Sequence, residues 1–423
     1  MPLSELLSFI VIPIYFVFIG VELLYLRFAK QKYYRLNDSI SSISTGVIQQ
    51  TIGIFIHIMI YLSYDWLQRN GSIQALFGVK AIPNTLLWYV IAFLFFDFLY
   101  YWFHRTSHEV NIVWASHVVH HSSEEYNLST ALRQGTFQGL FSWPFFLVMA
   151  VFGFPLEMFL VVSVLDLLWQ YFLHTRAVGK LGPLEWFMNT PSHHRVHHGK
   201  NPQYIDRNHA GALIIWDRMF GTFEPEGEEV VYGITKPLNS WNPFWANIES
   251  FKDLMYDAVH TKRWADKFTV WFKPPGWRPR DLPPYVTPKI DPKNVIKFDT
   301  EVPFGINMYA LFQFVLNLGF AVWVLTQVKA NIEAGTLINL VGPAFIVVLS
   351  LTNIGSIMEM KRWAFVVEIA KNIAVGILLV LALHTHTPLW VLTGGAFLYV
   401  IVTLAWLFPF IKQAEKAKVT YAV

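Results

Sequence analysis

Residues 85–121 read TLLWYVIAFLFFDFLYYWFHRTSHEVNIVWASHVVHH. The first half, to Phe103, is an apolar run in which Asp97 is the one charged residue. Its length is typical of a transmembrane helix, because crossing a hydrocarbon core of about 30 Å takes about 20 apolar residues. The second half carries five histidines. This stretch therefore joins a membrane span directly to a cluster of candidate metal ligands.

The rest of the 423-residue chain has the same apolar character. It is 54% hydrophobic and 14% charged, whereas soluble chains are about 25% charged. We predict an all-α integral membrane protein with about nine transmembrane helices and a cytoplasmic, histidine-rich helical cap over a dimetal site. The nine spans are expected near residues 6–27, 43–63, 85–103, 139–153, 155–174, 304–327, 336–357, 363–383 and 388–410.

Charge and cysteine content exclude several classes of function. The net charge of +3 is small for this length, so no nucleic-acid partner is expected. The chain has no cysteine, which excludes disulfides, cysteine-ligated zinc, iron–sulfur clusters and thiol nucleophiles. A metal site in this protein has to be built from imidazole and carboxylate groups.

The distribution of basic residues predicts the orientation in the membrane. Arg27, Lys30, Lys32 and Arg35 follow the first span, and short loops rich in lysine and arginine stay on the cytoplasmic side. Counting spans onward places the histidine clusters and the C-terminus in the cytoplasm. We expect N-terminal transmembrane helices (1–84), a catalytic domain (85–240), a cytoplasmic cap with a proline-rich connector (241–303) and C-terminal transmembrane helices with almost no polar side chains (304–423).

Nine histidines form the candidate metal site. Three clusters have helical spacing, and residues at i, i+3 and i+4 share one helix face. We therefore expect each cluster to aim its imidazoles at one point, joined by a histidine at the end of the fifth span. Two ions with four or five ligands each need eight to ten ligands. The nine are His104, His108, His117, His120, His121, His174, His194, His197 and His198.

Two acids inside the membrane strengthen this interpretation. Asp97 lies seven residues before His104, and Asp166 lies eight residues before His174. An intramembrane acid is costly and is functional by default. We expect Asp97 and Asp166 to support the catalytic site by accepting the second N–H of ligating imidazoles. His193 is expected beside the ligands, while Asp206, Asn208 and the step from Trp216 to Asp217 are polar positions that could brace them.

The spacing alone does not identify the metal, since imidazole suits iron, zinc, copper and nickel. A structural zinc needs only four ligands. Nine ligands at a lipid boundary fit an oxygen-activating di-iron centre better, because hydroxylation of an unactivated C–H bond requires a redox-active metal. A zinc-binding membrane transporter is the alternative that is not an enzyme, and it predicts ligands in mid-membrane along a transport pathway.

The histidine pattern resembles the fatty acid hydroxylase and sterol desaturase superfamily of membrane di-iron enzymes. The stretches DFLYYWFHRTSHEVNIVWASHVVHHSSEEYNLSTALRQ (97–134) and LGPLEWFMNTPSHHRVHHGKNPQYIDRNHAGALIIWDRMFGTFEPE (181–226) resemble, within it, the monooxygenases that cleave alkylglycerols. The similarity is dense from about 85 to 240. It implies two iron ions, tetrahydrobiopterin and O2 as co-substrate. It also implies hydroxylation of the carbon next to the ether oxygen of an ether lipid, giving a fatty aldehyde and a glycerol derivative.

The resemblance carries the metal ligands over onto the nine histidines listed above. It also implies that Glu109, beside the first cluster, binds the pterin or relays protons. Gln170 departs from the pattern, because other branches can have a histidine there, and the role of His209 is open. The nearest alternative is a fatty acid or sterol hydroxylase or desaturase fed by an electron-transfer protein. The membrane is the endoplasmic reticulum if the source is eukaryotic and the cytoplasmic membrane if it is bacterial, and a homodimer stays open.

Overall fold

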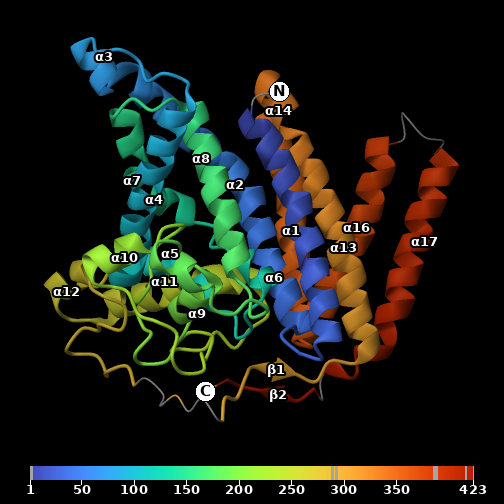
Figure 1. The fold of residues 1–423 in the computed structure, drawn as a ribbon. Helices are drawn as coiled ribbons and strands as arrows, with labels where there is room; N and C mark the ends of the chain where they lie inside the picture. The colour runs from blue at the N-terminus through green and yellow to red at the C-terminus, as the bar shows by residue number, and fades with distance from the viewer. Residues whose placement is uncertain (1–2, 287–289, 291–293, 384–388, 415–416, 423) are drawn as a thin grey trace. The chain divides into compact units, whose positions relative to one another are not determined.

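The computed structural model describes residues 3–286, 290, 294–383, 389–414 and 417–422. The chain divides into two compact units, residues 1–238 with 246–295 and residues 239–245 with 296–423. Both units are mainly helical (Figure 1). Part of the predicted proline-rich connector, and residue 388 at the start of the last predicted span, lie outside the described residues.

The first unit contains the apolar helices that precede and surround the histidines. The longest are α1 (Leu3–Phe28), α2 (Leu36–Asn70), α4 (Leu86–Glu109) and α8 (Leu156–Leu173), with the shorter α3 (Ile73–Phe77) and α7 (Gln138–Val151) between them. Helix α4 packs on α5, α7 and α8. The tight turn between α7 and α8 uses Gly153, whose φ of 80° favours glycine.

Shorter helices at one end of this bundle carry most of the histidines. They are α5 (Asn111–His121), α6 (Leu128–Ala131), the 3-10 helix η1 (Gly182–Trp186), α9 (Pro191–His197), α10 (Ile215–Phe220), α11 (Pro243–His260) and α12 (Trp264–Thr269). Only Val110, in an extended conformation, separates α4 from α5, so the first two histidine clusters lie on either side of one sharp break. Helix α9 starts at Pro191, whose fixed φ suits a first helical turn.

The second unit is a bundle of apolar helices with a two-stranded sheet. Strands β1 (Asp299–Thr300) and β2 (Val419–Thr420) are antiparallel, with Asp299 opposite Thr420 and Thr300 opposite Val419. The helical elements are α13 (Phe304–Thr326), α14 (Val328–Glu333), η2 (Leu337–Leu340), α15 (Val341–Met358), α16 (Arg362–Leu383), α17 (Leu389–Leu407) and η3 (Phe408–Phe410).

The fold class is confirmed, but the count of nine spans is not. Within the described ranges, seven helices are long and apolar enough to cross a membrane. Helix α7, expected as a span, has 14 residues and is about 21 Å long at 1.5 Å per residue, too short to cross alone. Helix α16 is not among the seven, and it contains Arg362, Glu368 and Lys371.

The expectation of almost no polar side chains in the C-terminal helices is wrong. The carboxylate of Glu368, fully buried, accepts hydrogen bonds of 2.7–2.8 Å from the side chains of Tyr309, Asn353 and Lys371. Gln313, Asn372 and Tyr399 extend this network. In an apolar setting such groups satisfy one another across helices, so the polar residues hold α13, α15, α16 and α17 together.

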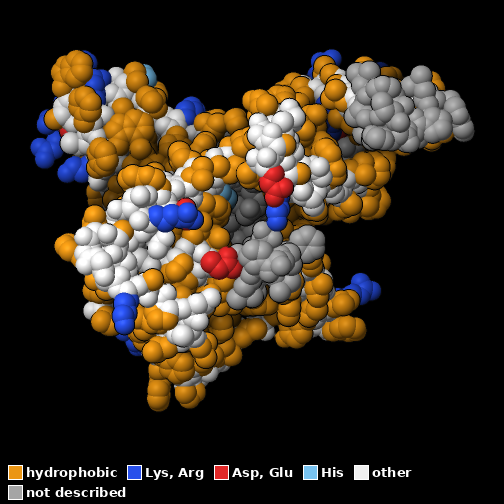
Figure 2. Space-filling view, turned by 90° about the horizontal axis from the view of Figure 1, so that it is seen from above, with side chains coloured by type: hydrophobic (Ala, Val, Ile, Leu, Met, Phe, Trp, Pro, Cys, Tyr) orange, Lys and Arg blue, Asp and Glu red, His pale blue; other side chains and the backbone are white. Residues whose placement is uncertain are grey.

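Hydrophobic side chains also cover much of the outer surface. Figure 2, seen from the end where the N-terminus lies, shows them over most of the face with isolated charges between them. Large apolar side chains that are more than half exposed include Val17, Leu24, Leu62, Leu86 and Phe345. A soluble protein rarely exposes so much contiguous apolar surface, and this surface suits contact with lipid.

Candidate metal centre

The structure brings all nine predicted histidines together in two buried groups. The five-histidine group consists of His104, His108, His117, His121 and His197. The four-histidine group consists of His120, His174, His194 and His198. In each group the candidate ligand atoms lie within 4.8 Å of one another. None of the nine residues is more than 5% exposed.

The partition corrects the expectation that each cluster points at one place. On α5, His117 and His121 belong to the five-histidine group, whereas His120 belongs to the four-histidine group. On and just after α9, His194 and His198 are together and His197 is in the other group. The reason is helix geometry: neighbouring residues differ by about 100°, so i and i+4 stay on one side while i+3 faces another ion site.

Hydrogen bonds to fixed acceptors orient five of the rings. The Nδ1 atoms of four rings lie 2.7–2.9 Å from backbone carbonyl oxygens, pairing His104 with His209, His120 with Arg133, His174 with Gln170 and His197 with Arg207. The fifth, Nδ1 of His117, lies 2.9 Å from Oε1 of Gln138. An oxygen of this kind can only accept, so Nδ1 carries the proton and Nε2 is left with a lone pair.

These lone pairs face one another within each group. Nε2 of His104 is 3.0 Å from Nε2 of His117, and Nε2 of His120 is 3.1 Å from Nε2 of His174. Burial lowers the pKa of His117 and His174 to about 4, so both rings are neutral at pH 7. Two neutral acceptors cannot bond each other, and a cation between them would replace repulsion by attraction. The donor set therefore fits a metal ion.

The spacing of the nitrogens also bears on the coordination angle. Two nitrogens bound at about 2.1 Å to one ion lie about 3.0 Å apart at a right angle and about 3.4 Å apart at the tetrahedral angle. The Nε2 pairs that approach most closely are 3.0 to 3.2 Å apart. The Nε2 atoms of His108, His197 and His198 are buried without a hydrogen-bond partner. The closest spacings lie between these two values, so they fit a shared ion in each group with either geometry.

The two intramembrane acids act differently from the expectation. Asp97 accepts the backbone N–H groups of Ala212 and Leu213 at 2.6 and 3.0 Å, and the indole N–H of Trp216 at 2.8 Å. Asp166 accepts the side chain of Gln170 at 2.5 Å. Among the described residues, neither Asp97 nor Asp166 forms a hydrogen bond with an imidazole. The rings instead use backbone carbonyls, because Asp97 is engaged in fixing the loop whose His209 carbonyl holds His104.

Gly211 shows how closely this loop is packed on the acids. A Cβ atom at this position would lie 2.7 Å from Oδ1 of Asp97 and 3.0 Å from Oδ1 of Asp166. Real Cβ contacts essentially never fall below 3.0 Å. Only glycine therefore lets the backbone of residues 209–213 reach the buried carboxyl pair.

The predicted polar braces from the cap are present. Nδ1 of His108 is 3.4 Å from the carboxylate of Asp206. The amide of Asn208 donates to the carbonyls of His193 and Glu224. Asp217 accepts the backbone N–H groups of residues 209 and 210 at 2.7 and 2.8 Å, so the loop after α9 is held at both ends.

Glu109, His193 and His209 lie at the edge of the site. Glu109 is half exposed and forms an ion pair of 2.8 Å with Arg105, one turn earlier on α4. His193 lies outside both groups, against Phe223 and 4.0 Å from Glu185. His209 is buried beside the five-histidine group, with its ring centroid 5.0 Å from that of His108. Its backbone carbonyl oxygen accepts the hydrogen bond from Nδ1 of His104.

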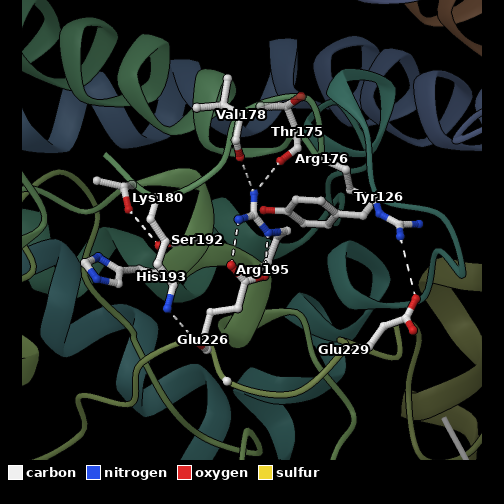
Figure 3. Close-up of polar contacts among 12 residues, drawn as sticks. Tyr126, Thr175, Arg176, Val178, Lys180, Ser192, His193, Arg195, Glu226 and Glu229 are labelled. Atoms are coloured by element: carbon white, nitrogen blue, oxygen red, sulfur yellow. Dashed lines mark hydrogen bonds and ion pairs between the residues drawn. The ribbon is translucent and has the colours of Figure 1, made fainter. Parts of the chain in front are cut away.

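Arg195, which the sequence interpretation did not single out, fastens the four-histidine group. Its guanidinium bonds both carboxylate oxygens of Glu226, at 2.6 and 2.7 Å, and the carbonyl oxygens of Thr175 and Val178, at 3.0 and 2.8 Å (Figure 3). Thr175 directly follows His174. The arginine thus ties α9, which carries His194, to the end of α8. The indication in the sequence was that a charged residue, Arg195, stands between His194 and His197 of the third cluster.

A cavity of about 560 Å³ borders both groups on the side of the cap. Four ring residues line it: His108, His121, His197 and His198. Asp206 lines it as well, whereas Glu109 does not.

Apolar helices of membrane-spanning length, with histidine groups that fit metal at their ends, define a class of membrane-embedded enzyme. Residues 89–222 match the fatty acid hydroxylase family. No solved structure matches significantly.

Curated relatives narrow the class. The chain is 39% identical over 359 residues to alkylglycerol monooxygenase from Xenopus tropicalis, covering 84% of this chain and 78% of that protein. It is 40% identical over 342 residues to the Homo sapiens enzyme of that name, covering 79% and 73%. To the Danio rerio enzyme it is 44% identical over 251 residues, covering 58% and 54%. The chain therefore belongs to the alkylglycerol monooxygenase family of membrane monooxygenases, and the resemblance seen in the sequence is confirmed.

Proposed function

We propose that this protein cleaves the ether bond of alkylglycerols with O2, two iron ions and tetrahydrobiopterin. One oxygen atom of O2 enters the C–H bond next to the ether oxygen and the other leaves as water. The hemiacetal then collapses to a fatty aldehyde and a glycerol derivative. When bound, the iron ions would activate O2 and the reduced pterin would supply two electrons, leaving as dihydropterin.

The observation that carries the proposal is the pair of buried histidine groups with opposed Nε2 lone pairs. Five and four neutral imidazoles are suitable ligands for two iron ions. Backbone carbonyls at Nδ1 fix four of the nine rings before metal arrives, and the low exposure of the rings limits contact with bulk water. Nine histidines are more than the four ligands that a structural zinc needs.

Three acids belong to the proposed site without being metal ligands themselves. Asp97 and Asp166 position the loop and helix that present His104 and His174. Glu109 does not line the cavity; it relays protons at the end of α4, where its charge acts on Asp206. Aromatic and aliphatic side chains of the neighbouring spans would hold the alkyl chain in the bilayer. We place the histidine groups and the C-terminus on the cytoplasmic side, with lipid as the partner and the oligomeric state open.

Metal analysis combined with a product assay tests the proposal. Purified protein should contain about two irons per chain and convert an alkylglycerol to aldehyde only with O2 and tetrahydrobiopterin. His120→Ala and His197→Ala, one in each group, should abolish turnover, whereas His260→Ala on the exposed end of α11 should not. Turnover driven by a reductase without pterin would favour the fatty acid or sterol hydroxylase alternative. Bound zinc with metal flux into vesicles would favour a transporter.

A further inference from the structure

The cavity beside the histidines has the size of a small-molecule site. Its volume of about 560 Å³ lies within the range of about 300–1,000 Å³ for ligand pockets. Its floor contains His108, His121 and His197 of the five-histidine group and His198 of the four-histidine group. A molecule bound there would therefore lie against both candidate metal sites.

A row of carboxylates on α11 also lines the cavity. Glu249, Asp253 and Asp257 all line the cavity, and their spacing of four residues places them on one face of the helix. Asp257 is held by Arg278 through three hydrogen bonds of 2.8–3.0 Å. Glu249 is only 17% exposed and forms an ion pair with Lys236 at 3.3 Å. Its carboxylate can therefore accept further hydrogen bonds from a ligand.

Aromatic rings also line the cavity. Trp114 is one of them, with its ring centroid 4.9 Å from that of His108 and 5.5 Å from that of His121. Tyr256, Trp277 and Tyr285 are the others. Flat aromatic faces favour a flat ligand, because stacked rings gain contact area and attraction.

We propose that this cavity binds the reduced pterin of the proposed function, with the N–H edge of its pyrimidine ring on Glu249 and its rings beside Trp114. The inference rests on the proposed function, since it assigns a place to that cofactor. A pterin is a planar heterocycle whose ring N–H and exocyclic amine resemble a guanidine, the partner that a carboxylate binds with two parallel hydrogen bonds. An alkyl chain would instead meet the charges of Lys236, Asp253 and Arg278.

The test is a direct titration of the purified, iron-loaded full chain in detergent. Tetrahydrobiopterin is added without O2, and binding is followed by calorimetry and tryptophan fluorescence. Glu249→Gln removes the charge of the acceptor and should weaken binding by about 10- to 100-fold. Ser250→Trp fills the cavity next to Glu249 and should abolish binding. Glu229→Gln, 76% exposed and outside the cavity, is the matched control and should bind like the wild type, and all variants should keep their iron.

The outcomes separate this inference from the proposed function. Wild-type affinity in both Glu249→Gln and Ser250→Trp would overturn the assignment of the cavity while leaving a pterin-dependent enzyme. An unchanged pterin affinity with a raised KM for alkylglycerol would show that the cavity holds the lipid head group, which also overturns it. A wild-type protein that binds no pterin and turns over with a reductase would refute the inference together with the proposed function.

Discussion

Replacement of Arg195 by lysine keeps the positive charge but removes the planar fork. The guanidinium makes four hydrogen bonds, two to Glu226 and two to the carbonyls of Thr175 and Val178. A lysine ammonium is a single point that cannot reach both carboxylate oxygens and both carbonyls from one position. Two bonds are therefore lost. At about 1.5 kcal/mol for each bond to a charged group, the substitution should cost about 3 kcal/mol.

The substitution should weaken metal binding at the four-histidine group, to which His174 and His194 belong. Nε2 of His194 and His174 are 3.2 Å apart, and Arg195 joins the two segments that present them. We expect Arg195→Lys to lower the iron content from about two to about one per chain, measured by elemental analysis, and to lower the thermal unfolding midpoint. Arg69→Lys, in an exposed pair with Asp65, is the control and should change neither. Full iron content and an unchanged midpoint in Arg195→Lys would refute the reasoning.

Three further perturbations test other parts of the molecule. Glu368→Gln leaves Lys371 buried without its counter-charge and should lower the free energy of unfolding by about 3–5 kcal/mol, with iron content unchanged; a denaturation curve like that of the wild type would contradict this. Gly211→Ala places a Cβ 2.7 Å from Oδ1 of Asp97 and should reduce iron content, whereas Gly179→Ala, with open space around it, should not. Chelation should lower the unfolding midpoint, and Fe2+ should restore it, because a ligand that binds only the native state stabilises that state; an unchanged midpoint after iron removal would count against a metal site.

Spacing along the chain was enough to select the nine histidines, because helical periodicity relates residues within one element. Spacing did not predict which histidines belong to which of the two groups. Whether His120 joins His117 or His174 depends on how α5 packs against α8, which is a long-range contact. The second N–H partners were also not predicted, since four of the five are backbone carbonyls and the fifth is the side chain of Gln138 on another helix. Every residue has a backbone carbonyl, so the sequence does not show which carbonyl oxygens accept these hydrogen bonds.

The same limit explains the polar network of the second unit. Gln313 and Tyr399 each lie in an apolar run of the sequence, and Glu368 lies only three residues before Lys371. Packing turns them toward one another, because an unpaired polar group in an apolar setting costs several kcal/mol, on the order of 2–7. The apolar pattern predicted the position of α7 but not that it is too short to count as a span, because the helix has only 14 residues.

The two histidine groups adjoin each other, because α5 and α9 divide their histidines between them. Each of these short segments supplies ligands to both groups. His121 of one group stacks on His198 of the other, with centroids 4.4 Å apart and planes 20° apart. The rotation of about 100° between neighbouring helical residues places His120 and His121 in different groups. A cofactor in the adjoining cavity would lie next to His121 of one group and His198 of the other, because both residues line that cavity.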